Sequence, residues 1–300
     1  MRRISLIVIL ALALVPWCSA SIASSSAGTA PLPALNDPAT GESLPGKFIF
    51  ADFFTSDIEA AKRFYGSLFG WEWRWESPDH SYGIFYQGDI AVAGVALKEE
   101  TDTGRPYGRW IYYISTEDVP KKVADIVAAG GRVLLEPRSM PDRGTLAVVA
   151  DTEGAPFGLL DSSSGDPADY RSEAGEWLWV SLYSQDVDQA SRFYGSQFGY
   201  EITRADDTGD ERDLFLSKGG FARAAISPLS TDSGSHPTWV GYVQVEDVSA
   251  YVARAVAQGG EVLMGPDPAI LDGNLVIVSD PMGAPFALIH WTWDDVESAQ

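Results

Sequence analysis

Residues 57–71 read DIEAAKRFYGSLFGW, and residues 186–200 read DVDQASRFYGSQFGY. The two stretches match at an offset of 129 residues. The same offset relates three further pairs: Trp110 and Trp239, Gly130-Gly131 and Gly259-Gly260, and Gly154-Ala-Pro-Phe157 and Gly283-Ala-Pro-Phe286. Because so many matches share one offset, the chain contains a duplicated unit, and a unit of this length is a whole domain rather than a solenoid repeat.

The first half of each unit has the pattern of a strand, a helix and further strands. In the first copy, residues 48–55 are strand-like and lead to Asp57, whose side chain can accept hydrogen bonds from the first turn of a helix. Apolar residues then recur at helical spacing until Gly70, which can take the left-handed conformation that ends a helix. The alternation of Trp71, Trp73 and Trp75 with charged residues is typical of a half-buried strand, and we assign these tryptophans to the core.

The second half of the unit repeats this order. It comprises a strand over 109–116, a helix over 119–129, and later strands ending in 146–150 and 156–160. Asp151-Thr-Glu-Gly154 and Asp280-Pro-Met-Gly283 begin with Asp and end with Gly, as tight turns do. The sequence therefore predicts an α+β fold with tandem βαβββ modules, two in each domain and four in all.

The repeat also sets the domain boundaries. We expect an export signal at 1–20, a flexible linker at 21–46, domain 1 at 47–160, an interdomain linker at 161–176, domain 2 at 177–291 and an acidic tail at 292–300. The segment at 24–46 is rich in Ser, Ala, Pro and Gly and has no apolar period, which favours a tether.

The N-terminus has the composition of a cleaved export signal. Arg2 and Arg3 precede an apolar run, Ile4–Val15, that is too short to remain as a membrane anchor. Small residues fit cleavage after Ala20 or Ala23, so we expect a periplasmic or secreted protein. Cys18, the only cysteine, could instead carry a lipid and tether the protein to the envelope.

Composition excludes some partners. The chain has 300 residues, is 45% hydrophobic and carries a net charge of −21, so it can fill more than one core but lacks the positive surface that phosphate backbones or anionic lipids require. We expect no nucleic-acid partner and no membrane contact beyond a lipid on Cys18. The sequence leaves open whether the chain forms a homo-oligomer.

The order of these motifs resembles the vicinal oxygen chelate superfamily, which includes glyoxalases, bleomycin resistance proteins and dioxygenases. The resemblance covers roughly residues 47–160 and 176–290. It implies that paired modules curl their sheets into half-open cups and that the ligand sits on the concave face.

The resemblance also implies where a metal would be bound. Metal-using members typically place a ligand on the first strand of a module, seven residues before the helix-opening Asp, and a carboxylate on the last strand. The first-strand positions hold Phe50, Ile111, Trp179 and Val240, and the last-strand positions hold Gly158 and Ala287. None of these side chains binds a metal, so we expect no metal and no cofactor, although a divalent metal held by some other ligand set stays open.

The remaining chemistry is sparse. His80, His236 and His290 fit loop or edge positions, and each has a surface role as its simplest interpretation. Asp52 shares a strand face with Phe50 and Phe54, so it needs a partner, either a ligand or an arginine such as Arg105 or Arg109. With a ligand, Asp52 would act as an orienting acceptor or as a general base.

The candidate ligand-binding residues lie on the first strands of the modules. They would line the cups if the sheets face as they do in the family, although core packing is the alternative for each: Phe50, Asp52, Phe54, Tyr113, Trp179, Ser181, Tyr183 and Tyr242. Aromatic walls with few polar groups suit a flat or apolar small molecule. No catalytic residue is assigned.

Three functions remain open. The first is metal-independent binding of a small apolar or aromatic molecule. The second is a lyase or dioxygenase with a non-standard ligand set, for example Asp52 with His80 or His236, which would then lie within a few ångströms of each other. The third is a structural or partner-binding module, which predicts filled cups.

Overall fold

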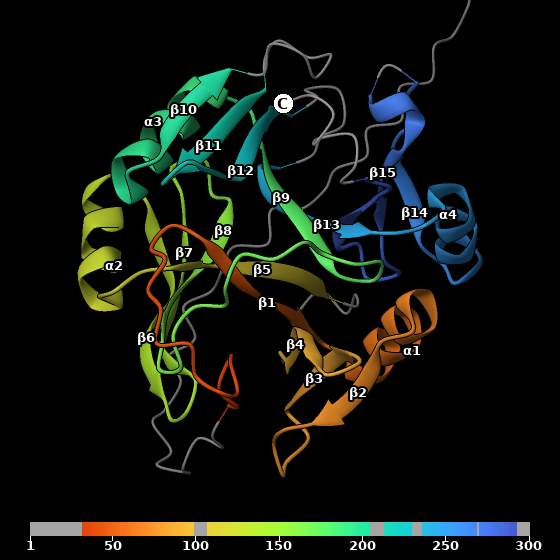
Figure 1. Ribbon diagram of the computed structural model, residues 1–300, viewed down its shortest axis with the longest axis horizontal. Coiled ribbons are helices and arrows are strands. Elements are labelled where there is room, and N and C mark those ends of the chain that lie inside the picture. Colours follow the sequence, from red (N-terminus) through yellow and green to blue (C-terminus); the bar gives the residue numbers. More distant parts are fainter. Residues whose placement is uncertain (1–31, 99–106, 205–212, 230–235, 269, 293–300) are drawn as a thin grey trace, which may run out of the picture.

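The computed structural model describes residues 32–98, 107–204, 213–229, 236–268 and 270–292. The predicted export signal, Cys18 and most of the predicted acidic tail lie outside these residues. Figure 1 shows the chain from residue 32 onward as two curled β-sheets with helices packed against them.

Domain 1 forms an eight-stranded sheet, which we name sheet A, in the order β2-β3-β4-β1-β5-β8-β7-β6. Its elements are β1 (Phe48–Thr55), α1 (Ile58–Phe69), β2 (Glu72–Trp75), β3 (Tyr82–Gln87), β4 (Ile90–Leu97), β5 (Gly108–Ser115), α2 (Val119–Ala128), β6 (Arg132–Met140), β7 (Gly144–Ala150) and β8 (Pro156–Ser162). The first strands of its two modules, β1 and β5, pair antiparallel at the centre of the sheet.

Domain 2 repeats this arrangement in a second eight-stranded sheet, sheet B, in the order β10-β11-β12-β9-β13-β16-β15-β14. Its elements are β9 (Trp177–Ser184), α3 (Val187–Phe198), β10 (Glu201–Arg204), β11 (Leu214–Lys218), β12 (Phe221–Pro228), β13 (Thr238–Gln244), α4 (Val248–Ala257), β14 (Glu261–Met264), a short 3-10 helix (Leu271–Gly273), β15 (Leu275–Ser279) and β16 (Pro285–Ile289). The predicted α+β fold of tandem βαβββ modules is confirmed.

The predicted helix ends are present. Asp57 Oδ1 accepts from Ala60 N at 2.8 Å, and Asp186 Oδ1 accepts from Gln189 N at 2.8 Å, so each carboxylate satisfies a free amide of the first turn. Gly70 ends α1 with φ 78°, a conformation that is costly for residues with a Cβ.

The period of two along each strand separates two apolar faces. On sheet A, Phe53, Trp110 and Tyr112 face the helices and belong to one large core that continues into domain 2. In that core Phe64 of α1 lies 6.1 Å from Phe286 of β16, centroid to centroid. The tryptophans of β2 pack against the same core, although Trp73 and Trp75 are only half-buried.

The opposite face of each sheet carries a smaller apolar cluster. We call the face of sheet A around Ile49, Ile111, Tyr113, Leu146, Val148 and Leu160 cup 1. We call the face of sheet B around Val240, Tyr242, Leu275, Ile277, Ala287 and Ile289 cup 2. Helices from different domains pair on the other side of the sheets, α1 with α4 and α2 with α3 (Figure 1).

Residues 32–46, which we name the strap, differ from the expectation of a free tether. The strap has no helix or strand, but it lies against domain 1. Thr40 N donates to Ser164 O at 2.9 Å, and Leu44 N donates to Asp166 Oδ2 at 2.6 Å. Hydrogen bonds to the interdomain linker therefore hold this part of the predicted 21–46 linker against the rest of the chain.

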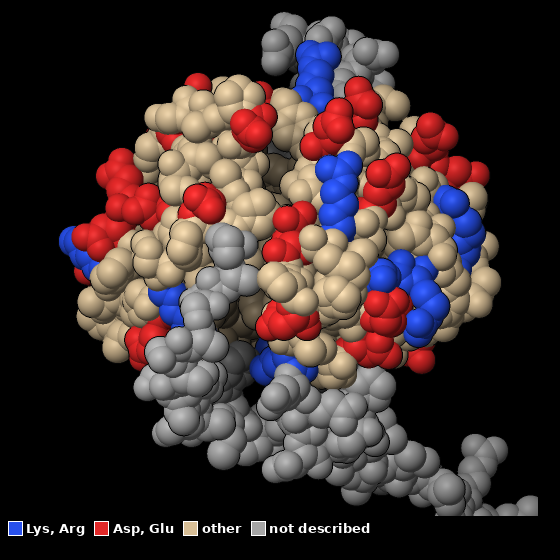
Figure 2. Space-filling model, turned by 90° about the horizontal axis from the view of Figure 1, so that it is seen from below, with Lys and Arg blue, Asp and Glu red and all other residues tan. Residues whose placement is uncertain are grey.

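Acidic side chains are scattered over the face shown in Figure 2, and the basic ones between them form no continuous surface there. Among the described residues, no helix is both long and apolar enough to cross a membrane.

Candidate functional site: two unequal cups

Cup 1 is built around the side chains of β1 that point away from the helices. Phe50 and Phe54 pack at its edge, half-buried, and Asp52 lies between them at 4% exposure. Tyr113 reaches the same face from β5. The structure therefore brings these four predicted residues together on the predicted face.

Asp52 is held by tyrosines. Tyr82 Oη donates to Asp52 Oδ1 at 2.9 Å, and Tyr113 contributes a further hydrogen bond that favours the ionised form. Burial raises the pKa of Asp52, although the positive charge of Arg143 and both tyrosines act in the opposite direction. The positive charge that acts on Asp52 comes from Arg143. Arg109 is exposed and is not among the groups that act on Asp52, and Arg105 lies outside the described residues.

Two glycines make this cluster sterically feasible. A Cβ at Gly94 would lie 2.0 Å from both Asp52 Oδ1 and the Tyr82 hydroxyl. A Cβ at Gly158 would lie 2.2 Å from the ring of Tyr113, its register partner on β5. The backbone of β4 and β8 thus leaves the space that the acid and the tyrosine rings fill.

Arg143 comes from the turn between β6 and β7 and is only 2% exposed. Its guanidinium lies 4.4 Å from the centroid of the Phe50 ring, a cation–π distance, and its Nε donates to Pro33 O at 2.7 Å. Arg143 could not be singled out from the sequence, because an arginine in a Pro-Asp-Arg-Gly turn has the pattern of a surface residue.

Cup 2 carries hydroxyl groups in place of the acid. Ser181 stands where Asp52 stands in the repeat, and it is buried beside Tyr242. The hydroxyls of Tyr183 and Tyr242 are 2.9 Å apart and share a hydrogen bond. Burial raises the pKa of both tyrosines, so both are neutral hydrogen-bonding groups at neutral pH.

An aromatic wall stands beside these hydroxyls. Trp179 is half-buried and meets Phe215 edge to face, with ring centroids 6.2 Å apart. All four predicted residues of domain 2, namely Trp179, Ser181, Tyr183 and Tyr242, therefore share one face. Phe215 is a further member that the sequence analysis did not single out.

The positions at which the family places metal ligands carry no donor in either cup. Phe50 and Ile111 occupy the first-strand positions of cup 1, and the ring of Tyr113 fills the space beside Gly158 on the last strand. In cup 2, Ala287 is the register partner of Tyr242. Over the described residues, no three His, Cys, Asp or Glu side chains gather as a metal site would require. These residues do not fit a metal of the type that the family uses.

The described histidines lie elsewhere. His80 stacks on Trp75 with ring centroids 4.5 Å apart, and His290 Nδ1 lies 3.0 Å from Val245 O. His236 is exposed. No histidine is among the groups that act on Asp52, so the ligand set of Asp52 with a loop histidine gains no support.

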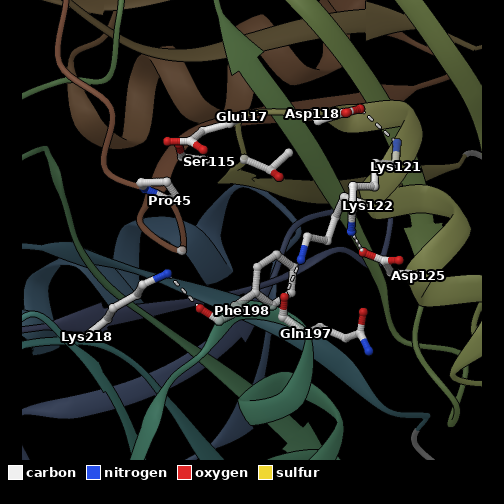
Figure 3. A pocket seen from close by; sticks show the side chains of 12 residues that line it. Pro45, Ser115, Glu117, Asp118, Lys121, Lys122, Asp125, Gln197, Phe198 and Lys218 are labelled. Carbon is white, nitrogen blue, oxygen red and sulfur yellow. Dashed lines mark hydrogen bonds and ion pairs between the residues drawn. The ribbon is translucent and has the colours of Figure 1, made fainter.

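A pocket of about 230 Å³ lies outside both cups, at the junction of α2 with the end of α3 (Figure 3). Its lysines are already engaged. Lys122 Nζ donates to Gln197 O, and Lys218 Nζ donates to Phe198 O at 2.7 Å, so both ammonium groups satisfy carbonyls at the end of α3. Lys122, on α2, therefore serves the contact between the domains.

Comparison with known proteins agrees with this architecture. Residues 47–159 and 177–288 match the Glyoxalase/Bleomycin resistance protein/Dioxygenase superfamily. The putative glyoxylase CFP32 of Mycobacterium tuberculosis is 28% identical over 256 residues, which cover 84% of this chain and 97% of that protein. The anthracycline biosynthesis protein DauV of Streptomyces sp. (strain C5) is 29% identical over 261 residues, covering 82% of this chain and 94% of DauV.

Solved structures share the fold. A Mn(II)-bound glyoxalase from Novosphingobium aromaticivorans matches with a TM-score of 0.53 and 18% identity, over 82% of this chain and 83% of that one. An extradiol ring-cleaving dioxygenase from B. fuscum matches with a TM-score of 0.54 and 14% identity, over 85% of this chain and 75% of that one. Because the family match spans both domains, the chain belongs to the glyoxalase/bleomycin resistance protein/dioxygenase superfamily as a tandem two-domain member.

Proposed function

We propose that this chain is an exported protein that binds a small apolar or aromatic molecule without a metal. The proposal rests on the side chains at the expected metal-ligand positions of both cups, none of which can bind a metal. Where metal-using relatives place ligands, the chain has Phe50, Ile111, Trp179, Val240, Gly158 and Ala287. What remains on each face is an aromatic wall around a few buried polar groups, which is the composition of a small-molecule site.

Cup 2 is the better candidate for a freely exchanging ligand. Trp179 and Tyr183 are half-buried, so part of each ring is accessible. A flat ligand would lie against Trp179 and place one polar group at the Tyr183 and Tyr242 hydroxyls. Apolar burial contributes about 25 cal/mol per Å², which association costs largely offset, so the hydroxyl pair would decide which apolar molecule binds.

The relatives support a flat aromatic ligand class. DauV is named for anthracycline biosynthesis, and anthracyclines are planar polycyclic molecules. Such a molecule suits a wall formed by Trp179 and Phe215, since offset stacking and edge contacts are favourable for aromatic rings.

Isothermal titration with anthraquinone-2-sulfonate tests the proposal. We expect saturable binding to the wild-type chain, an affinity about tenfold lower for Trp179→Leu and a smaller loss for Tyr242→Phe, since each 1.4 kcal/mol is tenfold. Trp75→Leu is the matched control, because Trp75 is half-buried on β2 beside His80, away from both cups. Absence of saturable binding, or equal losses in Trp179→Leu and Trp75→Leu, would contradict the proposal.

The enzyme alternative is a lyase or dioxygenase. The relative CFP32 favours it, since that protein is described as a putative glyoxylase. Its expected ligand set does not form around Asp52, whose partners are Tyr82, Tyr113 and Arg143. The third alternative is a structural or partner-binding module, which predicts that the cups are filled. For cup 2, filling stays a prediction.

A further inference from the structure

The two cups differ in what lies over them. Leu32 and Leu35 of the strap pack against the apolar cluster of cup 1. The apolar side chains on cup 2 all come from domain 2 itself, as far as the described residues go. At the offset of the repeat, the strap's Leu32 corresponds to Asp161, and residues 162–164 are serines, so the interdomain linker offers cup 2 no apolar equivalent.

The strap also makes a polar contact with cup 1. Pro33 O accepts a hydrogen bond from Arg143 Nε at 2.7 Å, and Arg143 in turn covers the Phe50 ring and acts on Asp52. The strap thus presents one carbonyl oxygen between two branched apolar side chains. This is the arrangement that a bound molecule would present to the same groups.

The part of the strap over cup 1 is held separately from the rest. Asn36 Nδ2 donates to Gly165 O at 2.7 Å, and Thr40 Oγ1 donates to Asp166 O at 2.8 Å, so the chain is fastened from Asn36 onward. Ordering residues 32–35 costs conformational entropy. The hydrogen bond with Arg143 and the packing of two half-buried leucines offset this cost. Release of residues 32–35 from cup 1 would therefore break the Arg143 hydrogen bond and the leucine packing and would leave the hydrogen bonds of Asn36 and Thr40 in place.

We propose that cup 1 is a second ligand site, occupied by the chain's own Leu32–Leu35, for a molecule that carries a carbonyl or carboxylate oxygen between apolar groups. This inference rests on the proposed function, in that it takes the cups to be ligand sites. Arg143 binds the oxygen, and the apolar groups replace Leu32 and Leu35. Because the strap is tethered, its effective concentration is high, and a free ligand must compete with it.

The test compares a chain that begins at Ser24 with one that begins at Asp37. The probe is the blocked peptide acetyl-Leu-Pro-Ala-Leu-Asn-amide, which has the sequence of residues 32–36. We expect the shorter chain to bind one equivalent of peptide, and the longer chain to bind it at least tenfold more weakly. Arg143→Gln in the shorter chain should weaken peptide binding at least fivefold. No peptide binding by a shorter chain that keeps its circular dichroism and cooperative melting, or equal binding by both chains, would overturn the inference.

A point variant keeps the test valid if the shorter chain does not fold. Leu35→Asp in the longer chain should expose cup 1 and restore peptide binding, whereas Leu97→Asp, at an exposed leucine of β4, should not. Restored binding in Leu35→Asp supports the inference, and binding equal to that of Leu97→Asp overturns it.

Titration of the same chains with anthraquinone-2-sulfonate separates the two proposals. Trp179-dependent binding of that probe without peptide binding overturns only the strap inference, and peptide binding without probe binding overturns only the proposal for cup 2.

Discussion

The hydroxyl of Tyr65 in domain 1 donates a hydrogen bond to Asp280 Oδ2 in domain 2, at 2.9 Å. The repeat makes this contact reciprocal, because Tyr194 in domain 2 donates to Asp151 Oδ2 in domain 1 at 3.0 Å. In each case the other carboxylate oxygen accepts backbone amides of its own turn, as Asp151 Oδ1 does from Ala155 N at 2.9 Å. The Asp-first turns therefore shape the last hairpin of one domain and fasten it to the helix of the other.

Tyr65→Phe and Tyr194→Phe test this contact. Each removes the donor to a buried aspartate and also the acceptor for an indole, since Trp110 Nε1 donates to Tyr65 Oη at 3.0 Å. We expect each substitution to lower the free energy of unfolding by about 1–3 kcal/mol, the usual cost of leaving a buried polar group unsatisfied. Chemical denaturation measures the loss, and the two losses should add in the double variant.

Tyr251→Phe is the matched control for the loss of a hydroxyl. Its ring is half-buried and lies 3.8 Å from the Arg254 guanidinium, a contact that phenylalanine keeps. We expect a change within about 0.5 kcal/mol. Equal losses in Tyr251→Phe and Tyr65→Phe would show that the reciprocal hydrogen bonds do not stabilise the domain contact.

Gly94→Ala tests whether glycine provides the space for the acid cluster of cup 1. The added methyl would meet Asp52 and Tyr82 at 2.0 Å, so the hydrogen bond between them must break or the strands must shift. We expect a loss of about 1–3 kcal/mol of unfolding free energy, as for other overpacked cores. Gly195→Ala in α3, with its nearest neighbour at 3.7 Å, should instead stabilise by about 0.5–1 kcal/mol. A neutral Gly94→Ala would disprove the assigned packing.

Because Asp52 is buried, it makes the free energy of unfolding depend on pH. Its pKa is raised in the folded state above the ordinary value of 3.8, so the folded protein binds this proton more tightly than the unfolded chain. Wild-type protein therefore loses stability from this group as pH rises above 3.8. Asp52→Asn does not titrate, and we expect its unfolding free energy, relative to wild type, to increase between pH 3 and pH 7.

Asp79 is the control, because its contribution to stability changes with pH in the opposite direction. Hydrogen bonds from Ser81 and Ser77 lower its pKa to about 2, so its contribution to stability is present above the ordinary value of 3.8 and is lost as pH falls toward 2. Asp79→Asn should therefore become less stable relative to wild type as pH rises from 2 to 4. Denaturation curves collected at matched pH for both variants measure the two slopes. Slopes of the same sign would contradict the assigned environments.

Much of the fold follows from local signals in the sequence. The period of two placed Phe50, Asp52 and Phe54 on one face, and the register of β1 with β5 brings Tyr113 beside them. The capping aspartates and terminal glycines marked the helices because each solves a local backbone problem.

The polar partners of cup 1 could not be predicted in the same way. The strap packs over the buried Arg143 and hydrogen-bonds to it. The strap has the composition of a tether, and its position depends on two leucines and on hydrogen bonds to the distant Ser164 and Asp166. Arg105 and Arg109 were the expected partners of Asp52, whereas the positive charge that acts on it comes from Arg143 in the β6–β7 turn.

The metal dependence of ligand binding decides whether the chain binds a small molecule without a metal. The measurement is isothermal titration of anthraquinone-2-sulfonate into the chain that begins at Ser24, with and without prior dialysis against EDTA, together with the metal content of the protein. We expect the same dissociation constant in both samples and far less than one metal ion per chain. One equivalent of zinc, iron or manganese, with binding lost on chelation and restored by that metal, would contradict it.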